Sequence, residues 1–435
     1  MKFFIYLSLI LIGLRVHCYH FPYLLDNHRN KSVPEHPSSI SEKEQKPWHN
    51  IVLNNAEFAF KLYKQIASDQ GDKNVFFSPL SISTAFAMLT LGAKYKTQSQ
   101  IYNGLAFNLS EIEEEKIHNG FQDLISSVDR QISIGNALFL DETLDVLWNF
   151  SEAIKTFYKA EQFSTDFVNP TNAEKQINDY VKNKTNGIIG DLVKGLTERT
   201  KMVVINYIIL QGAWINAFNT KQTREGIFIL DGNRTESVEM MYKRSSYNFL
   251  YDKDLFCSVV EMPCPGGVVV WLVLPDEGKL RHVEHTWTEK QLSTWAMSFK
   301  TKNLILILPK FNVSASHDIK AILQRMGMLD VFSKKADFSG ITGKRNLWVS
   351  EALQKSMVVV QEKSIISPQS VIDVRNGSQI SENMKNYSHM IFNRPFLMIV
   401  FDKTIQTILF MGKIQNPAKQ SSESVVTAKL SFFQD

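Results

Sequence analysis

Two short apolar runs constrain the fold of this chain more than any other feature of its sequence. Residues Met202–Leu210 and Val268–Pro275 are rich in β-branched side chains and contain almost no polar positions. A strand with one face in water alternates apolar and polar residues, whereas these runs are typical of strands buried on both faces. The sequence therefore predicts large β-sheets that are covered on both sides.

Helical periodicity dominates the first part of the chain. One apolar pattern at helical spacing lies within residues 56–68, and a second follows the Ser78-Pro79 pair. The residues with this spacing are Ala59, Leu62, Tyr63 and Ile66 in the first pattern and Ile82, Ala85, Phe86 and Leu89 in the second. Both patterns predict helices with a buried face. Because helices cluster early and strands late, the predicted class is α+β and not a doubly wound α/β sheet.

Residues 1–18 are typical of a secretory signal peptide. They combine a basic residue near the start, an apolar run over residues 3–12 and a compatible cleavage region. A transmembrane anchor needs about 20 apolar residues, whereas this run is shorter and breaks at Gly13 and Arg15. We therefore expect a secreted, extracellular protein that does not bind to a membrane.

Asn-x-Ser/Thr sequons are numerous, and in a secreted chain they predict surface sites that carry N-linked glycans. They lie at Asn30, Asn108, Asn149, Asn183, Asn233, Asn312, Asn376 and Asn386. The cysteines say less, because only Cys257 and Cys264 remain once Cys18 leaves with the signal peptide. Their odd separation would place them on opposite faces of an extended strand, so we expect free thiols and no disulfide.

Polar segments flank one continuous domain. Residues 19–50 contain proline and lack an apolar period, so they predict a flexible arm. Residues 420–435 form a C-terminal tail that is mostly polar. Residues 51–419 contain no linker, internal repeat or low-complexity tract, and we assign them to a single domain.

Charge and motif content argue against several classes of function. The formal net charge is only +4 and the lysines are scattered, so the sequence indicates no nucleic-acid partner and no heparin site. It has no Gly-x-Ser-x-Gly, no His-Glu-x-x-His, no phosphate-binding glycine loop and no zinc spacing. His282 and His285 lie one helical turn apart without a third ligand nearby, so we interpret them as solvated. We predict a monomer that is not an enzyme and has no catalytic residue, metal or cofactor.

Several sequence blocks occur in an order that is typical of one known family. Residues 392–396, Phe-Asn-Arg-Pro-Phe, precede an apolar hairpin that closes on residues 410–414 and the Asn416-Pro417 pair. Further blocks lie at residues 56–63, 77–89, 176–180, 206–208, 212–214 and 274–280. Together these blocks resemble the antitrypsin-like branch of the serpins, the serine protease inhibitors. The resemblance implies a serpin fold of three β-sheets wrapped by about nine helices, with an exposed reactive-centre loop between Glu362 and Phe392.

The resemblance also implies what this loop must do. In inhibitory serpins a protease cleaves the loop and stays attached while the loop inserts into the central sheet. The family pattern at the hinge is Glu-Lys-Gly-Thr-Glu followed by alanines, and this chain departs from it after two residues. The hinge here consists of Glu362, Lys363, Ser364, Ile365, Ile366, Ser367 and Pro368. Pro368 has no N–H for a central strand, so insertion should stall near it.

Further loop residues argue against insertion. Counting by twos from Ile365 places Asp373 and Arg375 among the side chains that would enter the core, where an unpaired ion costs several kcal/mol. Asn376 and Asn386 place glycan acceptors inside the loop. The loop is also longer than in the family pattern, so counting does not fix the scissile bond. The candidate scissile positions are Arg375, Ser378, Met384 and Lys385.

A sheet-opening region is implied as well. Its residues here are Ser81, Asn206, Trp214 and Gln354, and the family pattern has a histidine at the last position. Glutamine can both donate and accept hydrogen bonds. We interpret Gln354 as a satisfied polar residue beneath the sheet.

Three functional hypotheses remain. The first is a secreted serpin-family glycoprotein whose protease trapping is weak or lost, and the second is an active serine protease inhibitor with an unusual loop. The third is a carrier of a small apolar ligand such as a steroid or thyroid hormone, as some antitrypsin-like serpins are. Trp287, Trp295 and Phe299 could line such a site, but we interpret them as packing residues. The predicted partner is therefore a serine protease or a small apolar ligand.

Overall fold

The computed structural model describes residues 48–128, 132–187, 189–210, 212–365 and 387–418. The predicted signal peptide and C-terminal tail lie outside these residues. Helix α2 begins at His49, inside the range 19–50 that the sequence assigned to a polar arm, because Trp48, Ile51 and Val52 are buried in the core.

Ten α-helices lie within the described residues, where about nine were predicted. They are α2 (His49–Gln70), α3 (Pro79–Thr90), α4 (Tyr95–Gly104), α5 (Glu114–Ser127), α6 (Trp148–Tyr158), α7 (Pro170–Lys184), α8 (Leu280–Thr286), α9 (Lys290–Ser298), α10 (Ile319–Arg325) and α11 (Ser339–Thr342). Single 3-10 turns occur at η2 (Thr220–Gln222), η3 (Pro265–Gly267) and η4 (Asp330–Phe332).

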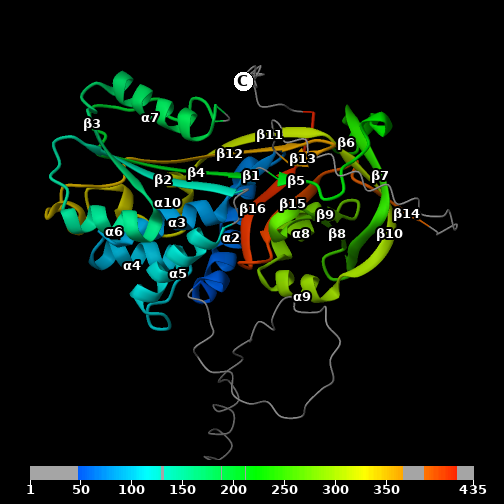
Figure 1. Cartoon of the computed structure of the whole chain (residues 1–435), viewed down its shortest axis with the longest axis horizontal. Helices are drawn as coiled ribbons and strands as arrows, with labels where there is room; N and C mark the ends of the chain where they lie inside the picture. Colours follow the sequence, from blue (N-terminus) through cyan, green and yellow to red (C-terminus); the bar gives the residue numbers. More distant parts are fainter. Residues whose placement is uncertain (1–47, 129–131, 188, 211, 366–386, 419–435) are drawn as a thin grey trace, which may run out of the picture.

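A seven-stranded sheet forms the centre of the molecule, in the order β3-β2-β4-β12-β13-β5 with β11 on the other side of β12. Its strands are β2 (Ile132–Asp141), β3 (Glu161–Thr165), β4 (Met202–Leu210), β5 (Gly212–Ala213), β11 (Phe311–Asp318), β12 (Glu351–Val360) and β13 (Ser364–Ile365). Helix α7 covers one face of this sheet, and helices α3 to α6 lie on the side of the other face (Figure 1).

The other strands form a nine-stranded network in the order β1-β16-β15-β9-β8-β7-β10-β14, with β6 on β7. They are β1 (Val75–Phe77), β6 (Arg224–Ile229), β7 (Thr235–Asp252), β8 (Cys257–Pro263), β9 (Val268–Pro275), β10 (Lys300–Pro309), β14 (Ser388–Ile391), β15 (Phe396–Asp402) and β16 (Thr407–Ile414). Strand β7 pairs with β6 near its start and with β8 near its end, so it belongs to two sheets. Dividing the network along β7 yields the three sheets that were predicted.

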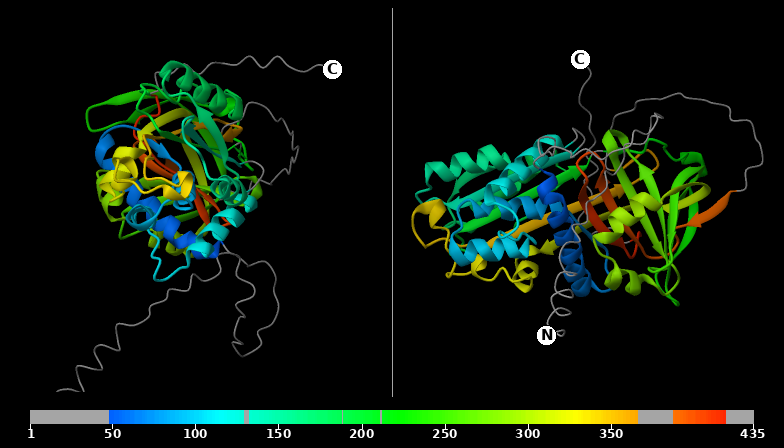
Figure 2. Two further views of the ribbon diagram at one scale, coloured as in Figure 1. Left: turned by 90° about the vertical axis from the view of Figure 1, so that its left-hand side faces the viewer. Right: turned by 90° about the horizontal axis from the view of Figure 1, so that it is seen from below.

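The two apolar runs form strands as predicted. Residues 202–209 of β4 and all of β9 are buried. On the α7 side of the central sheet, Ile177 packs with Phe139 and Ile205 in a separate small core. The right-hand view of Figure 2 shows the helices around the central sheet gathered at one end of the molecule and most of the nine-stranded network at the other.

The two predicted helices are also present, but they differ in burial. Helix α2 buries the predicted face, whereas every residue of α3 is buried. Helix α3 lies between the central sheet and other helices, so the prediction of one buried face was too narrow. Its start follows from the sequence, because the Ser78 side chain accepts a hydrogen bond from the Ser81 amide (3.2 Å) and Pro79 occupies the first helical position.

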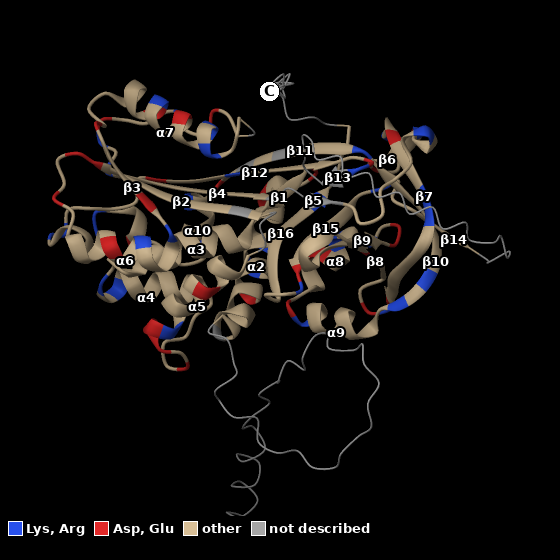
Figure 3. Cartoon of the chain, viewed as in Figure 1, with Lys and Arg blue, Asp and Glu red and all other residues tan. Residues whose placement is uncertain are grey.

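Basic and acidic residues are interspersed along the elements, as on α7 (Figure 3). Cys257 and Cys264 are buried free thiols, as predicted. Burial raises the pKa of Cys264 to about 12. No helix in the described part of the chain is long and apolar enough to span a membrane.

Candidate functional site

The base of the predicted loop already forms part of the central sheet. After β12 the chain turns through residues 361–363 and enters β13. Ile365 pairs with Val360 of β12 on one side and with Gly212 of β5 on the other, both antiparallel. The first two residues after the turn are therefore a short strand between two neighbours.

Beyond this short strand, the two central strands of the sheet pair with each other directly. Strands β4 and β12 pair directly and in parallel, and the pairing joins residues 203–206 to residues 351–354. Towards the hinge, β13 takes the place between β12 and β5. A longer inserted strand would thus have to separate β4 from β12, starting at the hinge and moving towards the Asn206–Gln354 pair.

Glu362 anchors the turn through its carboxylate. Thr223 Oγ1 donates to Glu362 Oε1 at 2.9 Å, and Lys310 Nζ lies 3.4 Å from the same oxygen. Lys310 also contacts Glu239 at 3.2 Å. Burial alone would raise the pKa of Glu362, but the hydrogen bonds from its own backbone and from Thr223, together with the Lys310 charge, hold it below its usual value. The Glu362 side chain is therefore a carboxylate at neutral pH.

Trp214 and Phe218 hold the backbone of the same turn. Trp214 Nε1 donates to the Gln361 carbonyl at 2.8 Å, and its backbone amide donates to the Lys363 carbonyl at 3.3 Å. The Phe218 amide donates to the Glu362 carbonyl at 2.7 Å. Three consecutive carbonyls thus have donors, which gives the turn a defined position although it has no helical or strand pairing of its own.

Gln354 joins the central sheet to the start of α3. Its Nε2 donates to the Ser78 carbonyl at 3.0 Å, and its Oε1 accepts from the Ser78 amide at 3.2 Å. The side chain is only 2% exposed. Both polar atoms of the Gln354 side chain thus have hydrogen-bond partners although the residue is buried. Ser81, which lies three residues after Ser78, is also buried. Its hydroxyl has no hydrogen-bond partner within the described chain.

Asn206 lies between Gln354 on β12 and Asn136 on β2, its two register partners. Its Nδ2 donates to Asn136 Oδ1 at 2.5 Å, and Asn136 Nδ2 donates in turn to the Tyr158 carbonyl at 3.2 Å. Asn136 was not among the residues predicted from the sequence. The available signal was an isolated polar residue within the apolar run of β2, although such a residue could equally have faced solvent.

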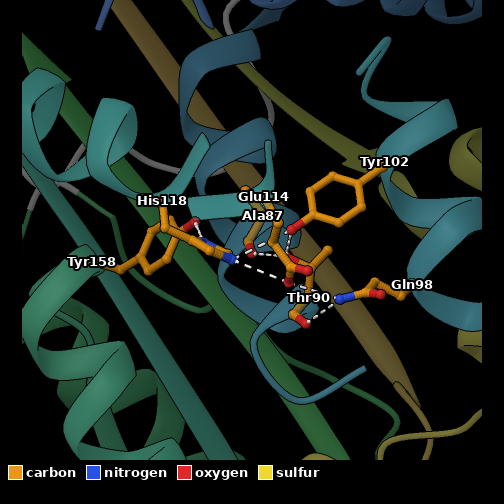
Figure 4. Close-up of polar contacts among 7 residues, drawn as sticks. All are labelled: Ala87, Thr90, Gln98, Tyr102, Glu114, His118 and Tyr158. Carbon is orange, nitrogen blue, oxygen red and sulfur yellow. Dashed lines mark hydrogen bonds and ion pairs between the residues drawn. The ribbon is translucent and has the colours of Figure 1, made fainter. Parts of the chain in front are cut away.

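A partly buried polar cluster continues from Tyr158 towards α5 (Figure 4). His118 Nδ1 lies 2.6 Å from Tyr158 Oη, and His118 Nε2 lies 3.3 Å from Tyr102 Oη and 3.6 Å from Glu114 Oε1. The hydrogen bond to His118 holds the pKa of Glu114 below its usual value. Gln98 Nε2 donates to the same carboxylate at 2.7 Å. Through Tyr158, Asn136 and Asn206, polar contacts therefore reach from the α4–α5 region to strand β4 of the central sheet.

The structure groups the predicted residues in two places. Ser81, Asn206 and Gln354 lie together where α3 meets the sheet, whereas Trp214 lies at the hinge with Glu362. Lys363 contributes its carbonyl, and Ser364 and Ile365 contribute strand pairing. The remaining hinge positions and all scissile candidates lie outside the described residues, namely Ile366, Ser367, Pro368, Arg375, Ser378, Met384 and Lys385.

The sequons differ in exposure. Four of the asparagines are exposed, namely Asn108, Asn149, Asn183 and Asn233. Asn312 lies within β11, paired with Val359, and is half-buried with its Oδ1 atom covered. Asn30, Asn376 and Asn386 lie outside the described residues. Asn312 is therefore the least accessible acceptor of the five that the structure describes.

The aromatic candidates take part in ring packing, whereas the two histidines lie at the surface. Trp287 packs edge-on against Phe60 and Tyr63, and Trp271 contacts the rings of both Trp295 and Phe299. His282 and His285 are exposed and contact backbone carbonyls. No group of three or more His, Cys, Asp or Glu residues in the described part of the chain could hold a metal ion.

Comparisons with known proteins agree with this geometry. The family model described as "Serpin (serine protease inhibitor)" matches residues 53–417. The chain is 38% identical to alpha-1-antiproteinase 2 of Equus caballus over 377 residues, which cover 86% of this chain and 88% of that protein. It is also 38% identical over 369 residues to the plasma serine protease inhibitor of Homo sapiens, covering 83% and 89% of the two chains.

A solved structure supports the same assignment. Human thyroxine-binding globulin in complex with its hormone superposes with a TM-score of 0.79 and 34% identity, covering 86% of this chain and all of that one. In this chain the central sheet takes the first residues of the following loop between β12 and β5. This chain belongs to the serpin family of serine protease inhibitors. Members of this family inhibit proteases and are not themselves enzymes, as predicted for this chain.

Proposed function

We propose that this chain is a secreted serpin that keeps the family fold but traps serine proteases weakly or not at all. The register of β13 carries the proposal. Ile365 opposes Val360 and Gly212, so a loop that continued in this register would place Pro368 opposite Met357 of β12 and Ile209 of β4. A strand between two neighbours needs its amides for hydrogen bonds, and proline has none to donate.

The same register would also bring a charge into the core. Alternate residues of β12 are buried, among them Ala352, Ser356 and Val360. Continuing from Ile365, Asp373 would oppose Ala352 on this buried face. Burying an unpaired carboxylate costs several kcal/mol, whereas the alanines of the family pattern cost nothing comparable. The energy released by insertion, which drives trapping, should therefore be small in this chain.

Loop cleavage tests this proposal. The purified chain is cut in the loop with a nonspecific protease, cleavage is verified by mass spectrometry, and the Tm is compared before and after. We expect little change in the Tm. The matched variant replaces Pro368, Asp373 and Arg375 by alanine, and we expect cleavage to raise its Tm strongly. A strong rise in the unmodified chain, or a covalent protease complex that survives SDS, would overturn the proposal.

Secretion and glycosylation are part of the same proposal. We assign residues 1–18 to a signal peptide, residues 51–419 to the serpin domain and residues 420–435 to a tail. Exposure of Asn108, Asn149, Asn183 and Asn233 supports the use of these sequons. Expression in a secreting cell line, N-terminal sequencing and glycosidase treatment test this. An intracellular, unglycosylated product that keeps residues 1–18 would contradict it.

Carriage of a small apolar ligand is a second candidate function. The observation that favours it is the fold likeness to a thyroxine complex. Because Trp287 and Trp295 are almost fully buried against other rings, they are not available to line a ligand-binding site. Titration with thyroxine and with cortisol, followed by intrinsic tryptophan fluorescence, tests the proposal. Saturable binding of one ligand per chain would support it, and no saturable signal with either ligand would contradict it.

A further inference from the structure

An exposed groove lies on the part of the nine-stranded network that β6, β7, β10 and β14 form. Its volume is about 490 Å³, and its lining includes Arg224, Glu225, Ile227, Met240 and Ile391. Two apolar side chains at the groove are exposed to solvent, Ile227 at 65% and Ile391 at 38%. A groove of mixed lining with exposed apolar side chains is a potential contact surface for another segment.

One wall of the groove is an open strand edge. Strand β6 pairs with β7 on one side, and on its other side the Ile229 amide donates to the Asn393 carbonyl at 2.7 Å. Amides on a strand alternate in direction, so those of Glu225 and Ile227 point the same way as that of Ile229. Within the described chain these two amides have no backbone acceptor on that side. An unpaired edge of this kind can accept an added strand.

The end of the described chain lies beside the β6–β7 hairpin that carries this edge. Asn416 Nδ2 donates to Glu236 Oε1 at 3.4 Å, and Gln415 Nε2 donates to the Leu230 carbonyl at 3.4 Å. Glu236 is the register partner of Phe228, which directly follows Ile227 in β6. The C-terminal tail therefore starts only a few strand positions from the groove.

The composition of the tail suits this surface. The family match ends at residue 417, so residues 419–435 are an addition to the family domain. Residues 419–424 are polar, whereas the apolar residues of the tail are concentrated after them at Val425, Val426, Leu430, Phe432 and Phe433. β-branched and aromatic side chains favour strands. At about 3.3 Å per residue, a connection of the length of residues 419–424 can span up to about 20 Å.

We propose that residues 425–433 of the tail dock in this groove of the same molecule and pair with the outer edge of β6. The docked tail supplies carbonyl acceptors to the amides of Glu225 and Ile227. Its apolar side chains cover Ile227 and Ile391. The polar residues 419–424 act as the connection between Ala418 and the docked segment.

Hydrogen exchange followed by mass spectrometry tests the proposal on the full-length chain. We compare this chain with a variant that ends at Ala418, and we expect the β6 amides near Ile227 to exchange about tenfold faster after truncation. We also expect tail amides in the full-length chain to exchange more slowly than in a synthetic peptide of residues 419–435. Equal exchange in both comparisons would overturn the proposal.

Point variants separate docking from general destabilisation. Ile227→Asp should release the tail and make its exchange as fast as that of the free peptide. Val168→Asp is the matched control, because Val168 is 75% exposed and lies between β3 and α7, away from the groove. Release of the tail by both variants would overturn the proposed site. Docking into another copy would appear in sedimentation as a dimer that truncation abolishes, and would overturn docking within one molecule.

Discussion

Gln354 provides the sharpest test of how the central sheet is held to the helices. Its amide makes two hydrogen bonds to the backbone of Ser78, directly before α3. Replacing it by methionine keeps the length and approximate volume of the side chain and removes both hydrogen bonds. The Ser78 carbonyl keeps a partner, because the Ile82 amide also donates to it at 3.3 Å. The Ser78 amide, in contrast, loses its acceptor in a buried place.

The expected magnitude follows from this single orphaned donor. A buried N–H without a partner costs about 1–3 kcal/mol. For a domain of this size, unfolding entropy scales to about 0.8 kcal/mol per degree, so a loss of about 2 kcal/mol lowers the Tm by about 2–3 °C. The effect is therefore modest, and it should be visible in both thermal and urea unfolding.

The assay compares the Gln354→Met variant with Gln361→Met. Gln361 lies just beyond the same strand, and its side chain is exposed. We expect a lower Tm and a lower urea midpoint for the first variant and neither change for the second. If Gln354→Met unfolds at the same urea concentration as the unmodified chain, the two hydrogen bonds do not stabilise the sheet against α3. Equal losses in both variants would point to a general effect of methionine.

Three further predictions concern the hinge and the thiols. Trp214→Phe removes the donor to the Gln361 carbonyl and should lower stability by about 1 kcal/mol in urea unfolding; no loss would show that water replaces the donor. Because the folded state lowers the pKa of Glu362, the contribution of its carboxylate to folding stability is present at neutral pH and is lost as pH falls through that pKa. The variant Glu362→Gln should therefore destabilise the chain more at neutral than at strongly acidic pH in urea titrations. Equal effects at both pH values would contradict this. Cys257 and Cys264, which are buried with raised pKa values, should resist iodoacetamide in the folded chain and react in denaturant, as adduct masses would show.

Strand and helix positions could be predicted because they depend on local pattern. The apolar run Val268–Pro275 has no polar face, and it indeed forms a strand buried on both sides. The period in residues 56–68 likewise marks the buried face of α2. For α3 the period underestimated burial, because a helix enclosed on all sides uses small residues such as Ser83 and Thr84 beside larger ones. Hydrophobic periodicity depends on a difference in polarity between two faces of a helix. A helix that is enclosed on all sides shows little such difference.

The partners of the site residues could not be predicted in the same way. Lys310 and Thr223 contact Glu362 from positions far away in the chain, and each is an ordinary polar residue in its local sequence. His118 belongs to a helix with a strongly polar start, so local reasoning gives no sign that its ring is buried against Tyr158. These contacts depend on tertiary placement, which a single sequence does not reveal.

The contrast between the hinge anchor and the loop explains how trapping can be lost without loss of the fold. Glu362 and Trp214 stabilise the turn in the uncleaved state, so substitutions there would affect the folded chain at once. Residues beyond Ile365 are subject to the requirements of a central strand only if the loop inserts. A proline at 368 or an acid at 373 therefore need not disturb the uncleaved fold, and its energetic penalty arises only on insertion. A chain that no longer depended on insertion could accumulate such changes while Gln354 and the hinge contacts stayed intact.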